Sequence, residues 1–345
     1  MNHIVFCVNN SWIKQCGITI KSILFYNPNE DFTFHILGKE ISPQNKSLLN
    51  EEISVISQTA KIEFHAITSE YDSKFIIREG DHISVETYYR FFAPDFLSTD
   101  VSKALYMDVD ILCAGSLKDL FDTDLSNKAC GMVLDMDYGD INKYNRLGFD
   151  FIEKYYNAGV ILLNLDYWRK HNLTQQLLDF VCTHPNKCLL HDQDAINAVL
   201  HGKIRRLQFK YDLQNIFFQT PLWADENANE VFEDEKVEKR YWPEILEDLK
   251  SPVLIHFTGP YKPWHKECNI PFTNLWRKFN SSAQKCHMKV GPKPKSFKQA
   301  VKFVLLKLAV KTKMKKQMPH IFKYPASVYE IEDRFIMEAA KSNFK

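Results

Sequence analysis

The sequence predicts an α/β protein with a mostly parallel central sheet and a basic helical C-terminal tail. Strand-like and helix-like runs alternate over residues 4–67, and further buried strand-like runs begin near residues 104, 129, 156 and 253. Alternation of strand, helix and strand is typical of a parallel sheet connected by helices. With 45% hydrophobic and 13% aromatic residues in a chain of 345, a sizeable core is also expected.

The N-terminal region shows the alternation most clearly. The expected elements are, in order, a strand over residues 4–8, a helix over 15–26, a strand over 31–37, a helix capped by Ser42 and a strand over 61–67. Later elements are a helix over 82–91, buried strands over 104–112, 129–134, 156–165 and 253–257, and a helix over 195–200. Ligands bind beyond the carboxyl ends of parallel strands, so Asn9 and Asn10, which follow the first strand, lie at the expected binding rim.

Two carboxylates interrupt the apolar run over residues 104–112. On a strand that rises about 3.3 Å per residue, Asp108 and Asp110 point to one face with Cα atoms about 6.6 Å apart. Burying two carboxylates together is unfavourable, and one hard divalent ion would remove the conflict. Carboxylate ligands suit Mg²⁺ or Mn²⁺, which typically bring phosphate oxygens as further ligands. Alternatively, one Asp caps the following turn and the other lies at the solvated end of the strand.

Further polar residues are expected at the same rim, each with a structural alternative. Arg90 is suited to clamp a diphosphate, although an exposed helical arginine is the more common case. Residues 157–159 (Asn-Ala-Gly) either allow close approach of the backbone to a ligand or form a turn into a strand. Asp192 and Gln193 either direct polar atoms to the rim or begin a helix, where acidic groups suit the helix dipole.

A lone histidine, His256, lies in the last apolar strand. Such a residue is more often a hydrogen-bonded part of the core than a ligand. Its context differs here, because neutral imidazole is a suitable third ligand beside two carboxylates. The glycine-containing loop that follows also carries Lys262, which suits a phosphate.

Hydropathy and cysteine spacing exclude several classes of protein. Met1 leads directly into the first strand without a basic segment, and no apolar run approaches the ~18 residues of a membrane span. We therefore expect a cytoplasmic protein without a signal peptide. The eight cysteines include no Cys-x-x-Cys pair, which argues against a cysteine zinc site and, in this compartment, against disulfides.

Five motifs in register resemble the retaining glycosyltransferases of family 8, which include bacterial lipopolysaccharide galactosyl- and glucosyltransferases and are related to glycogenin. The motifs are Trp12 after an Asn-rich turn, residues 106–110 (Tyr-Met-Asp-Val-Asp), 157–160 (Asn-Ala-Gly-Val), 192–194 (Asp-Gln-Asp) and 256–264 (His-Phe-Thr-Gly-Pro-Tyr-Lys-Pro-Trp). The resemblance covers about residues 3–280. It implies a GT-A type, Rossmann-like nucleotide-binding fold.

The resemblance also implies an activity: transfer of glucose or galactose from a UDP-sugar to a saccharide hydroxyl with an α-glycosidic product, on the lipopolysaccharide or lipooligosaccharide core. Asp108, Asp110 and His256 match the ligands of Mn²⁺, for which Mg²⁺ is the alternative. The residues that match donor-binding positions are Asn9, Asn10, Trp12, Arg90, Asp108, Val109, Asp110, Asp135, Asn157, Ala158, Gly159, Asp192, Gln193, His256, Gly259 and Lys262.

Two positions depart from the family pattern, and a third bears on mechanism. Trp12 stands where the family usually has a tyrosine stacked on uracil, and Asn9 where it commonly has an aspartate. Gln193 occupies the position expected for a nucleophile, and an amide is a poor one. We therefore expect catalytic roles for Gln193 and Asp192 in which Gln193 stabilises positive charge during front-face attack and Asp192 orients the sugar.

The C-terminal region is strongly basic, with twelve lysines and no Asp or Glu between Lys285 and Lys323, in a chain of formal net charge +1. Residues 296–316 place apolar and basic side chains on different sides of an expected helix. We expect a catalytic domain over residues 1–280 and, over 281–345, a tail that binds the inner face of the cytoplasmic membrane near a lipid-linked acceptor. The alternative is a helix packed on the catalytic domain. Without arginine or a base-stacking pattern, the tail is not expected to bind nucleic acid.

Two other functions compete with the transferase. A metal-dependent sugar-nucleotide hydrolase or phosphodiesterase would use Asp108 and Asp110 but would usually need a second metal with its own ligands. A non-catalytic basic membrane-binding protein would leave the acidic pair, His256 and Lys262 without a role.

Overall fold

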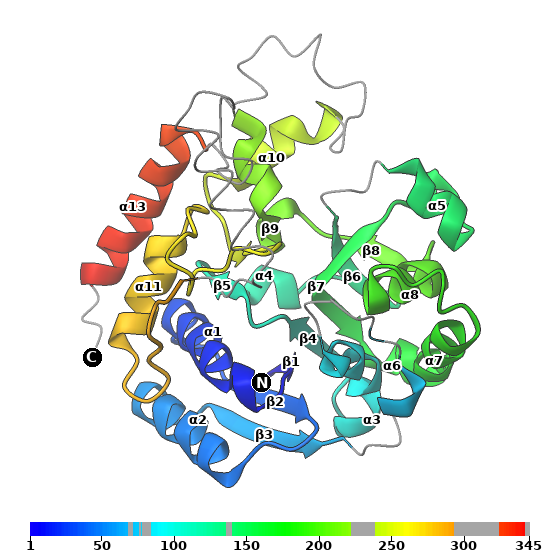
Figure 1. Ribbon diagram of the computed structural model, residues 1–345, viewed down its shortest axis with the longest axis horizontal. Helices are drawn as coiled ribbons and strands as arrows, with labels where there is room; N and C mark the ends of the chain where they lie inside the picture. The colour runs from blue at the N-terminus through cyan, green and yellow to red at the C-terminus, as the bar shows by residue number, and fades with distance from the viewer. Residues whose placement is uncertain are drawn as a thin grey trace.

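Figure 1 shows the computed structural model of the chain, which describes residues 1–67, 72–75, 77, 84–135, 140–221, 239–292 and 324–341. A seven-stranded sheet has the order β3-β2-β1-β4-β7-β6-β8, and a three-stranded sheet has the order β5-β10-β9. The strands are β1 Asn2–Cys7, β2 Phe32–Gly38, β3 Lys61–Ala66, β4 Lys103–Met107, β5 Ile111–Cys113, β6 Cys130–Leu134, β7 Tyr156–Asn164, β8 Ile204–Arg206, β9 Leu213–Gln214 and β10 Leu254–His256.

The main sheet is mostly parallel, as predicted. Strands β3, β2, β1 and β4 run parallel to one another, and β6 runs parallel to β8. Only β7 departs, because it pairs antiparallel with both β4 and β6. The three strands predicted before residue 68 are confirmed, with ends that differ by no more than two residues.

The helices cover both faces of the sheet. The α-helices are α1 Ile13–Tyr26, α2 Pro43–Ile56, α3 Ala93–Phe96, α4 Lys118–Phe121, α5 Ile141–Leu147, α6 Leu165–Lys170, α7 Leu173–Thr183, α8 His191–Leu200, α10 Trp242–Asp248, α11 Thr273–Ser282 and α13 Ala326–Lys341. Lys46 of α2 lies over the Phe64 ring, whereas Phe96 of α3 contacts His65. Because neighbouring side chains on β3 point to opposite faces, α2 and α3 cover opposite sides of the sheet.

Short 3₁₀ helices complete the described structure. They are η1 Asn10–Trp12, η2 Asp72–Lys74, η3 Val85–Phe92, η4 Phe151–Glu153, η5 Phe209–Tyr211, η6 Asn215–Gln219 and η7 Lys239–Tyr241. The helix expected over residues 82–91 is therefore a 3₁₀ helix where it is described. The predicted cap of α2 is confirmed, since the Ser42 side chain accepts the Asn45 N–H.

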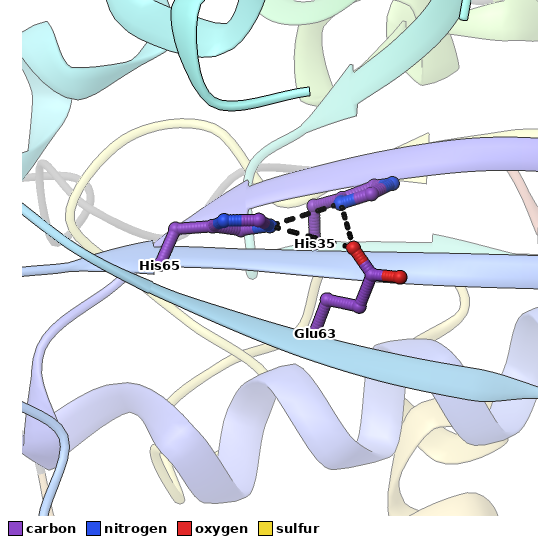
Figure 2. A group of neighbouring side chains, drawn as sticks. All are labelled: His35, Glu63 and His65. Atoms are coloured by element: carbon purple, nitrogen blue, oxygen red, sulfur yellow. Dashed lines mark hydrogen bonds and ion pairs between the residues drawn. The ribbon is translucent and has the colours of Figure 1, made fainter. Parts of the chain in front are cut away.

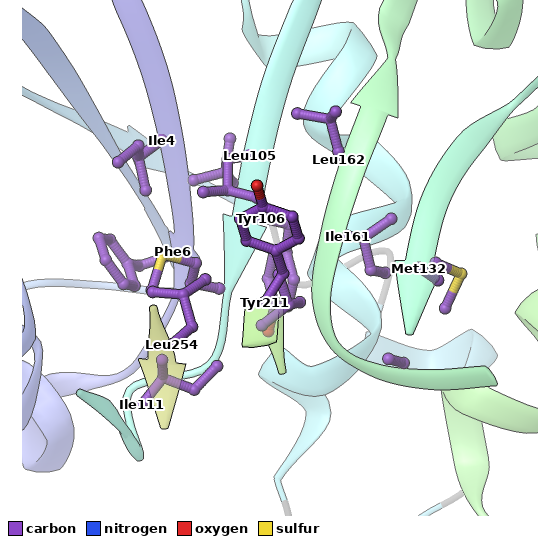
Figure 3. Packing of buried hydrophobic residues seen from close by; sticks show 14 of the residues in the cluster. Ile4, Phe6, Leu105, Tyr106, Ile111, Met132, Ile161, Leu162, Tyr211 and Leu254 are labelled. Carbon is purple, nitrogen blue, oxygen red and sulfur yellow. The ribbon is translucent and has the colours of Figure 1, made fainter. Parts of the chain in front are cut away.

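The core lies between the sheet and its helices. Figure 3 shows Ile4 and Phe6 of β1 beside Leu105 of β4, and Ile161 and Leu162 of β7 on the other side. These five side chains are fully buried. Burial of a large apolar side chain contributes about 1.5–3 kcal/mol, so this centre holds the strands that carry the polar rim.

The single strand predicted over residues 104–112 is wrong, because the chain changes sheet at the acidic pair. Strand β4 ends at Met107, and β5 begins at Ile111 in the three-stranded sheet. The Asp108 N–H still donates to the Gly159 carbonyl at 2.8 Å, and the Asp110 carbonyl accepts the Phe257 N–H at 3.0 Å. The two aspartates therefore occupy a turn between two sheets, a position that alternation along one strand does not describe.

Helix α13 packs against the body of the protein beside α11 (Figure 1). The Phe335 ring lies 5.6 Å from the Phe272 ring and 6.3 Å from the Tyr26 ring, measured between centroids. The basic helix predicted over residues 296–316 lies outside the described residues, so the division at residue 280 and the membrane role stay predictions. Among the described residues, no helix combines the length and apolar character that crossing a membrane requires.

We predict that Glu332→Ala destabilises the fold. The buried Glu332 carboxylate of α13 accepts the Asn274 and Leu275 N–H groups at 2.7 and 3.1 Å, at the start of α11. Removing the carboxylate leaves the two backbone N–H groups without their hydrogen-bond acceptor. This should lower the free energy of unfolding by about 1–3 kcal/mol, measured by urea denaturation. The exposed Glu330 provides the matched control Glu330→Ala. Equal stability of the two variants would contradict the role of Glu332.

Candidate active site

Two neighbouring cavities lie at the carboxyl ends of β1 and β4. The first is about 490 Å³ and the second about 340 Å³. The residues that line both are Thr87, Arg90, Asp108, Asp110 and Lys262. These shared residues form a charged wall between two spaces, each large enough for part of a small ligand.

Two members of the acid–histidine cluster, Asp108 and Asp110, belong to this wall, and the third member, His256, lines the second cavity. The potential ligand atoms of the cluster all lie within 4.8 Å of one another. His256 Nε2 is 3.4 Å from an oxygen of Asp110. The structure therefore brings His256, which is distant along the chain, to the neighbouring pair Asp108 and Asp110, and it does so through a turn and not through one strand.

A buried carboxylate behind the cluster orients His256. Asp212, fully buried, contacts His256 Nδ1 at 2.8 Å, so Nε2 faces Asp110. Burial alone would lower the pKa of His256, but Asp212 and Asp110 outweigh it and raise the pKa to about 10. A Cβ atom at Gly159 would overlap the His256 ring, so glycine is required at that position of β7.

Lys262 and Gly259 belong to the loop after β10. The Lys262 ammonium pairs with Asp110 and donates to the Phe257 carbonyl. Burial opposes ionisation of Asp110, but Lys262 and His256 outweigh it and hold the pKa of Asp110 well below its usual range. Gly259 has φ of +77°, in the left-handed region that favours glycine, and this lets the loop turn back toward the cavities.

Arg90 lines both cavities and is buried, not exposed. Its guanidinium contacts Asp108 at 3.1 Å and Asp192 at 3.0 Å, and it also donates to the Ala158 carbonyl. It lies over the Tyr106 ring, 4.1 Å from the ring centre. A buried guanidinium between two carboxylates ties the turn that carries Asp108 to helix α8, which carries Asp192.

Asp192 lies in the first turn of α8, as predicted, and its side chain turns to the second cavity. The Thr87 hydroxyl donates to one Asp192 oxygen at 2.7 Å, and Arg90 pairs with the other. Burial raises the pKa of Asp192, an effect that Arg90 and Thr87 partly offset. The Thr87 hydrogen bond and the Arg90 ion pair together hold Asp192 in one orientation.

The Gln193 amide, in the second cavity, forms hydrogen bonds through both its oxygen and its nitrogen. Its Oε1 accepts the Ala158 N–H at 2.9 Å, and its Nε2 donates to Asp135 at 3.1 Å and to the Tyr155 hydroxyl at 3.3 Å. Asp135 also accepts from Asn157 at 3.1 Å. Asn157, Ala158 and Gly159 line the cavity, whereas Asp135 supports Asn157 and Gln193 from behind.

Asn9, Trp12 and Val109 line the first cavity. The Trp12 ring lies 5.7 Å from the Trp264 ring at 63°, so one edge of the cavity is aromatic. The Asn9 side chain also caps η1 through the Ser11 N–H. Asn10 is not brought to either cavity: it is exposed, and its side chain binds Glu40, Ser42 and Asn45 near the start of α2.

The sequence pattern described as Glycosyl transferase family 8 matches residues 3–268, more than half of the chain. The protein belongs to this family. It is therefore a glycosyltransferase, and the resemblance predicted from the motifs is confirmed.

Similar proteins agree with this assignment. General stress protein A of Bacillus subtilis is 26% identical over 280 residues, which covers 78% of this chain and 90% of that protein. A lipopolysaccharide 1,2-glucosyltransferase of Escherichia coli is 29% identical over 277 residues, covering 78% of this chain and 75% of that protein. The crystal structure of the galactosyltransferase LgtC with donor and acceptor sugar analogues has a TM-score of 0.69 and 24% identity, and covers 82% of this chain and 96% of that one. This likeness confirms the predicted GT-A fold.

The cluster of this family 8 protein fits a divalent ion. Two carboxylates and one imidazole form a mixed ligand set suited to a divalent metal. Asp212 supplies the outer partner that metal-binding histidines commonly have. Asp108, Asp110 and His256 would hold the ion, and Arg90 and Lys262 balance the remaining charge of the wall.

Sequence reasoning missed several residues of this site. Asp212 lies between apolar residues in a region where no motif was apparent, and only its position behind His256 shows its role. Tyr106, within the recognised motif, donates its hydroxyl to Asp108. Thr87 links the Arg90 helix to Asp192. The one sequence signal for Asp212 that was not used is its position as a lone acid between Tyr211 and Leu213.

We predict that Asp212→Asn weakens divalent-metal binding about 10–100-fold, the range for loss of a carboxylate behind a metal-binding histidine. The measurement is Mn²⁺ titration of wild type and variant by calorimetry. Asp248→Asn is the matched control, because Asp248 is also buried but accepts the Lys210 N–H, away from His256. Unchanged Mn²⁺ affinity in correctly folded Asp212→Asn protein would show that Asp212 does not orient the histidine.

Proposed function

We propose that the protein is a retaining hexosyltransferase that moves glucose or galactose from a UDP-sugar to a hydroxyl of a saccharide acceptor. Mn²⁺ is the proposed ion, with Mg²⁺ as the alternative, and the product is an α-glycoside. One observation carries the proposal: the acid–histidine cluster stands between a larger cavity with an aromatic edge and a smaller cavity lined by amide and carboxylate groups. A nucleotide-sugar has the same order of parts, with its diphosphate between base and sugar.

The first cavity suits the nucleoside. Trp12 offers an indole face on which a uracil can stack, and base–aromatic stacking contributes about 1–3 kcal/mol. The Asn9 amide is the polar group placed to meet the base edge. Because Asn10 is held at the surface by α2, the proposal gives it no direct contact with the donor.

The second cavity suits the donor sugar. Asp192, Gln193 and Asn157 present fixed polar atoms that match the hydroxyl groups of a hexose. Glucose and galactose differ at one hydroxyl, and both sugars occur among the donors named by the similar enzymes. The donor is therefore proposed as one of these two.

In the reaction, the bond between the anomeric carbon and the diphosphate oxygen breaks as the acceptor oxygen forms the new bond. A divalent ion bound to the cluster would neutralise charge on the departing diphosphate. Lys262 lines both cavities and supplies a second positive group at the same point. The acceptor proton passes to the departing phosphate oxygen, so the step needs no other base.

Retention of configuration through front-face attack is consistent with the geometry of Gln193. A double displacement would need a nucleophile on the face opposite the diphosphate, as in retaining glycosidases. The Gln193 Oε1 already accepts the Ala158 N–H, and Asp192 is held by the Thr87 hydroxyl and by its ion pair with Arg90. We assign Gln193 to stabilise positive charge on the sugar and Asp192 to orient it.

The proposed acceptor is the saccharide core of lipopolysaccharide or lipooligosaccharide. The similar Escherichia coli enzyme is named for lipopolysaccharide, and the lysine-rich segment from 285 to 323 suits an anionic membrane surface. We therefore place the protein in the cytoplasm, with its tail at the inner face of the membrane.

The first expected result is UDP release that depends on both Mn²⁺ and Asp110. A panel of UDP-sugars is incubated with the protein, with and without Mn²⁺, and released UDP is measured. UDP-glucose or UDP-galactose should turn over, and Asp110→Ala should lower the rate at least about 100-fold, as expected for loss of a preorganised electrostatic group. Asp119→Ala, at an exposed aspartate of α4, is the control and should keep the wild-type rate.

Acceptor dependence separates transfer from hydrolysis in the same assay. A transferase releases UDP faster when a suitable core saccharide is added and produces a longer saccharide. Rapid metal-dependent release that no saccharide accelerates would favour a sugar-nucleotide hydrolase. Absence of turnover with every UDP-sugar and acceptor would refute the proposed donor class.

A second prediction concerns the covalent step. Acid quenching of a single turnover, followed by intact-protein mass spectrometry, should show no hexose attached to the chain, because front-face attack forms no glycosyl–enzyme bond. The donor analogue with fluorine at carbon 2 is used in parallel to slow any second step. A hexosyl adduct mapped to Gln193 or Asp192 would overturn the front-face assignment.

A further inference from the structure

A second cluster of metal-ligating side chains lies at the far edge of the main sheet. Figure 2 shows His35 of β2 facing Glu63 and His65 of β3. His35 and Glu63 are partners in the parallel register, and Glu63 and His65 share one face of β3 because they are two residues apart. We call these three residues the edge cluster. It belongs to strands that contribute nothing to the two cavities.

The three ligand atoms of the edge cluster are spaced as zinc ligands are. His35 Nδ1 is 3.0 Å from His65 Nε2. Glu63 Oε2 is 3.4 Å from His35 Nδ1 and 3.8 Å from His65 Nε2. Bonds of about 2.0–2.1 Å to a tetrahedral zinc ion place neighbouring ligand atoms about 3.3–3.4 Å apart. The cluster therefore provides three corners of a tetrahedron and leaves the fourth for water.

A third histidine orients the edge cluster. Nδ1 of His3, on β1, lies 2.9 Å from Nε2 of His35. The two rings stack with their centroids 5.2 Å apart. This contact occupies His35 Nε2 and leaves Nδ1 toward Glu63 and His65. When His35 Nε2–H donates to His3, the lone pair of His35 lies on Nδ1, as metal binding requires. The second ring nitrogen of a metal-binding histidine commonly has such a partner.

The edge cluster is accessible from one side. The His35 and His65 side chains are 3% and 17% exposed, whereas Glu63 is 52% exposed, so an ion can enter past the carboxylate. Within the described part of the chain, no lysine or arginine forms an ion pair with Glu63. The carboxylate is therefore available to a cation.

We propose that His35, Glu63 and His65 bind a zinc-class divalent ion that ties the edge strand β3 to β2. Two imidazoles and one carboxylate favour Zn²⁺, Co²⁺ or Ni²⁺ over Mg²⁺ and Mn²⁺, which prefer oxygen ligands. The ligand set thus differs from that of the acid–histidine cluster, which has two carboxylates and one imidazole. The proposal does not depend on the donor, the acceptor or the transferase reaction.

The test counts Zn²⁺ bound by the full chain in an Asp110→Ala background, which removes a ligand of the other cluster. Calorimetry should detect one tight Zn²⁺ site in this background. Adding Glu63→Gln should weaken it at least tenfold, and adding His65→Ala should abolish it. Adding His184→Ala, at an exposed histidine after α7, is the matched control and should change nothing. Mn²⁺ should not compete for the site.

Two further measurements keep the test decisive. Co²⁺ should give the strong visible absorption of a tetrahedral site in Asp110→Ala protein, and Glu63→Gln should reduce it. Zn²⁺ should raise the melting temperature of the wild-type protein more than that of the single variant Glu63→Gln. The rate of UDP release by this variant should equal that of the wild type. Because Glu63 is half exposed, this variant should fold normally, as circular dichroism will show. The proposal would be overturned if Zn²⁺ bound equally well to the Asp110→Ala parent and to its Glu63→Gln and His65→Ala derivatives. It would also be overturned if the parent bound no Zn²⁺.

Discussion

The buried guanidinium of Arg90 is the interaction on which the site depends. It lies between Asp108 and Asp192, at 3.1 and 3.0 Å, and stacks on Tyr106. A buried cation is tolerated only when anions and hydrogen-bond acceptors surround it, and here the anions belong to two different functional regions. The same interaction that neutralises Arg90 therefore ties the turn that carries Asp108 to helix α8, which carries Asp192 and borders the second cavity. If either aspartate moved, the buried guanidinium would lose one of its two carboxylate partners.

The junction between the two sheets adds a second constraint. The chain leaves the main sheet after β4, turns through Asp108 and Asp110, and enters the smaller sheet at β5. Strand β10 of the smaller sheet carries His256, and β7 of the main sheet carries Gly159, whose missing side chain makes room for the histidine ring. Asp108, Asp110 and His256 meet because the two sheets meet. Rigid strands on both sides hold these side chains with little freedom to rearrange.

The edge cluster shows how the same fold can build a site of different chemistry. The acid–histidine cluster is rich in oxygen and lies at the carboxyl ends of strands, whereas the edge cluster is rich in nitrogen and lies across the face of β2 and β3. Edge strands have unpaired backbone groups on one side and gain from any link to their neighbour. A metal-mediated link between β2 and β3 would serve that purpose without touching the reaction centre.

The sequence by itself determined the strands and helices before residue 68, the cap at Ser42, the family and most residues that line the two cavities. These features depend on local patterns of apolar and polar residues or on short motifs, which can be recognised in the sequence without knowing the fold. Only the tertiary structure decided that residues 104–112 divide between two sheets, because both halves of the run are equally apolar. It also decided that Arg90 is buried, that Asn10 binds α2 at the surface, and that Asp212 stands behind His256. Each of these depends on a neighbour supplied by a distant part of the chain, and the register of β2 against β3 likewise created the edge cluster from residues that show no motif.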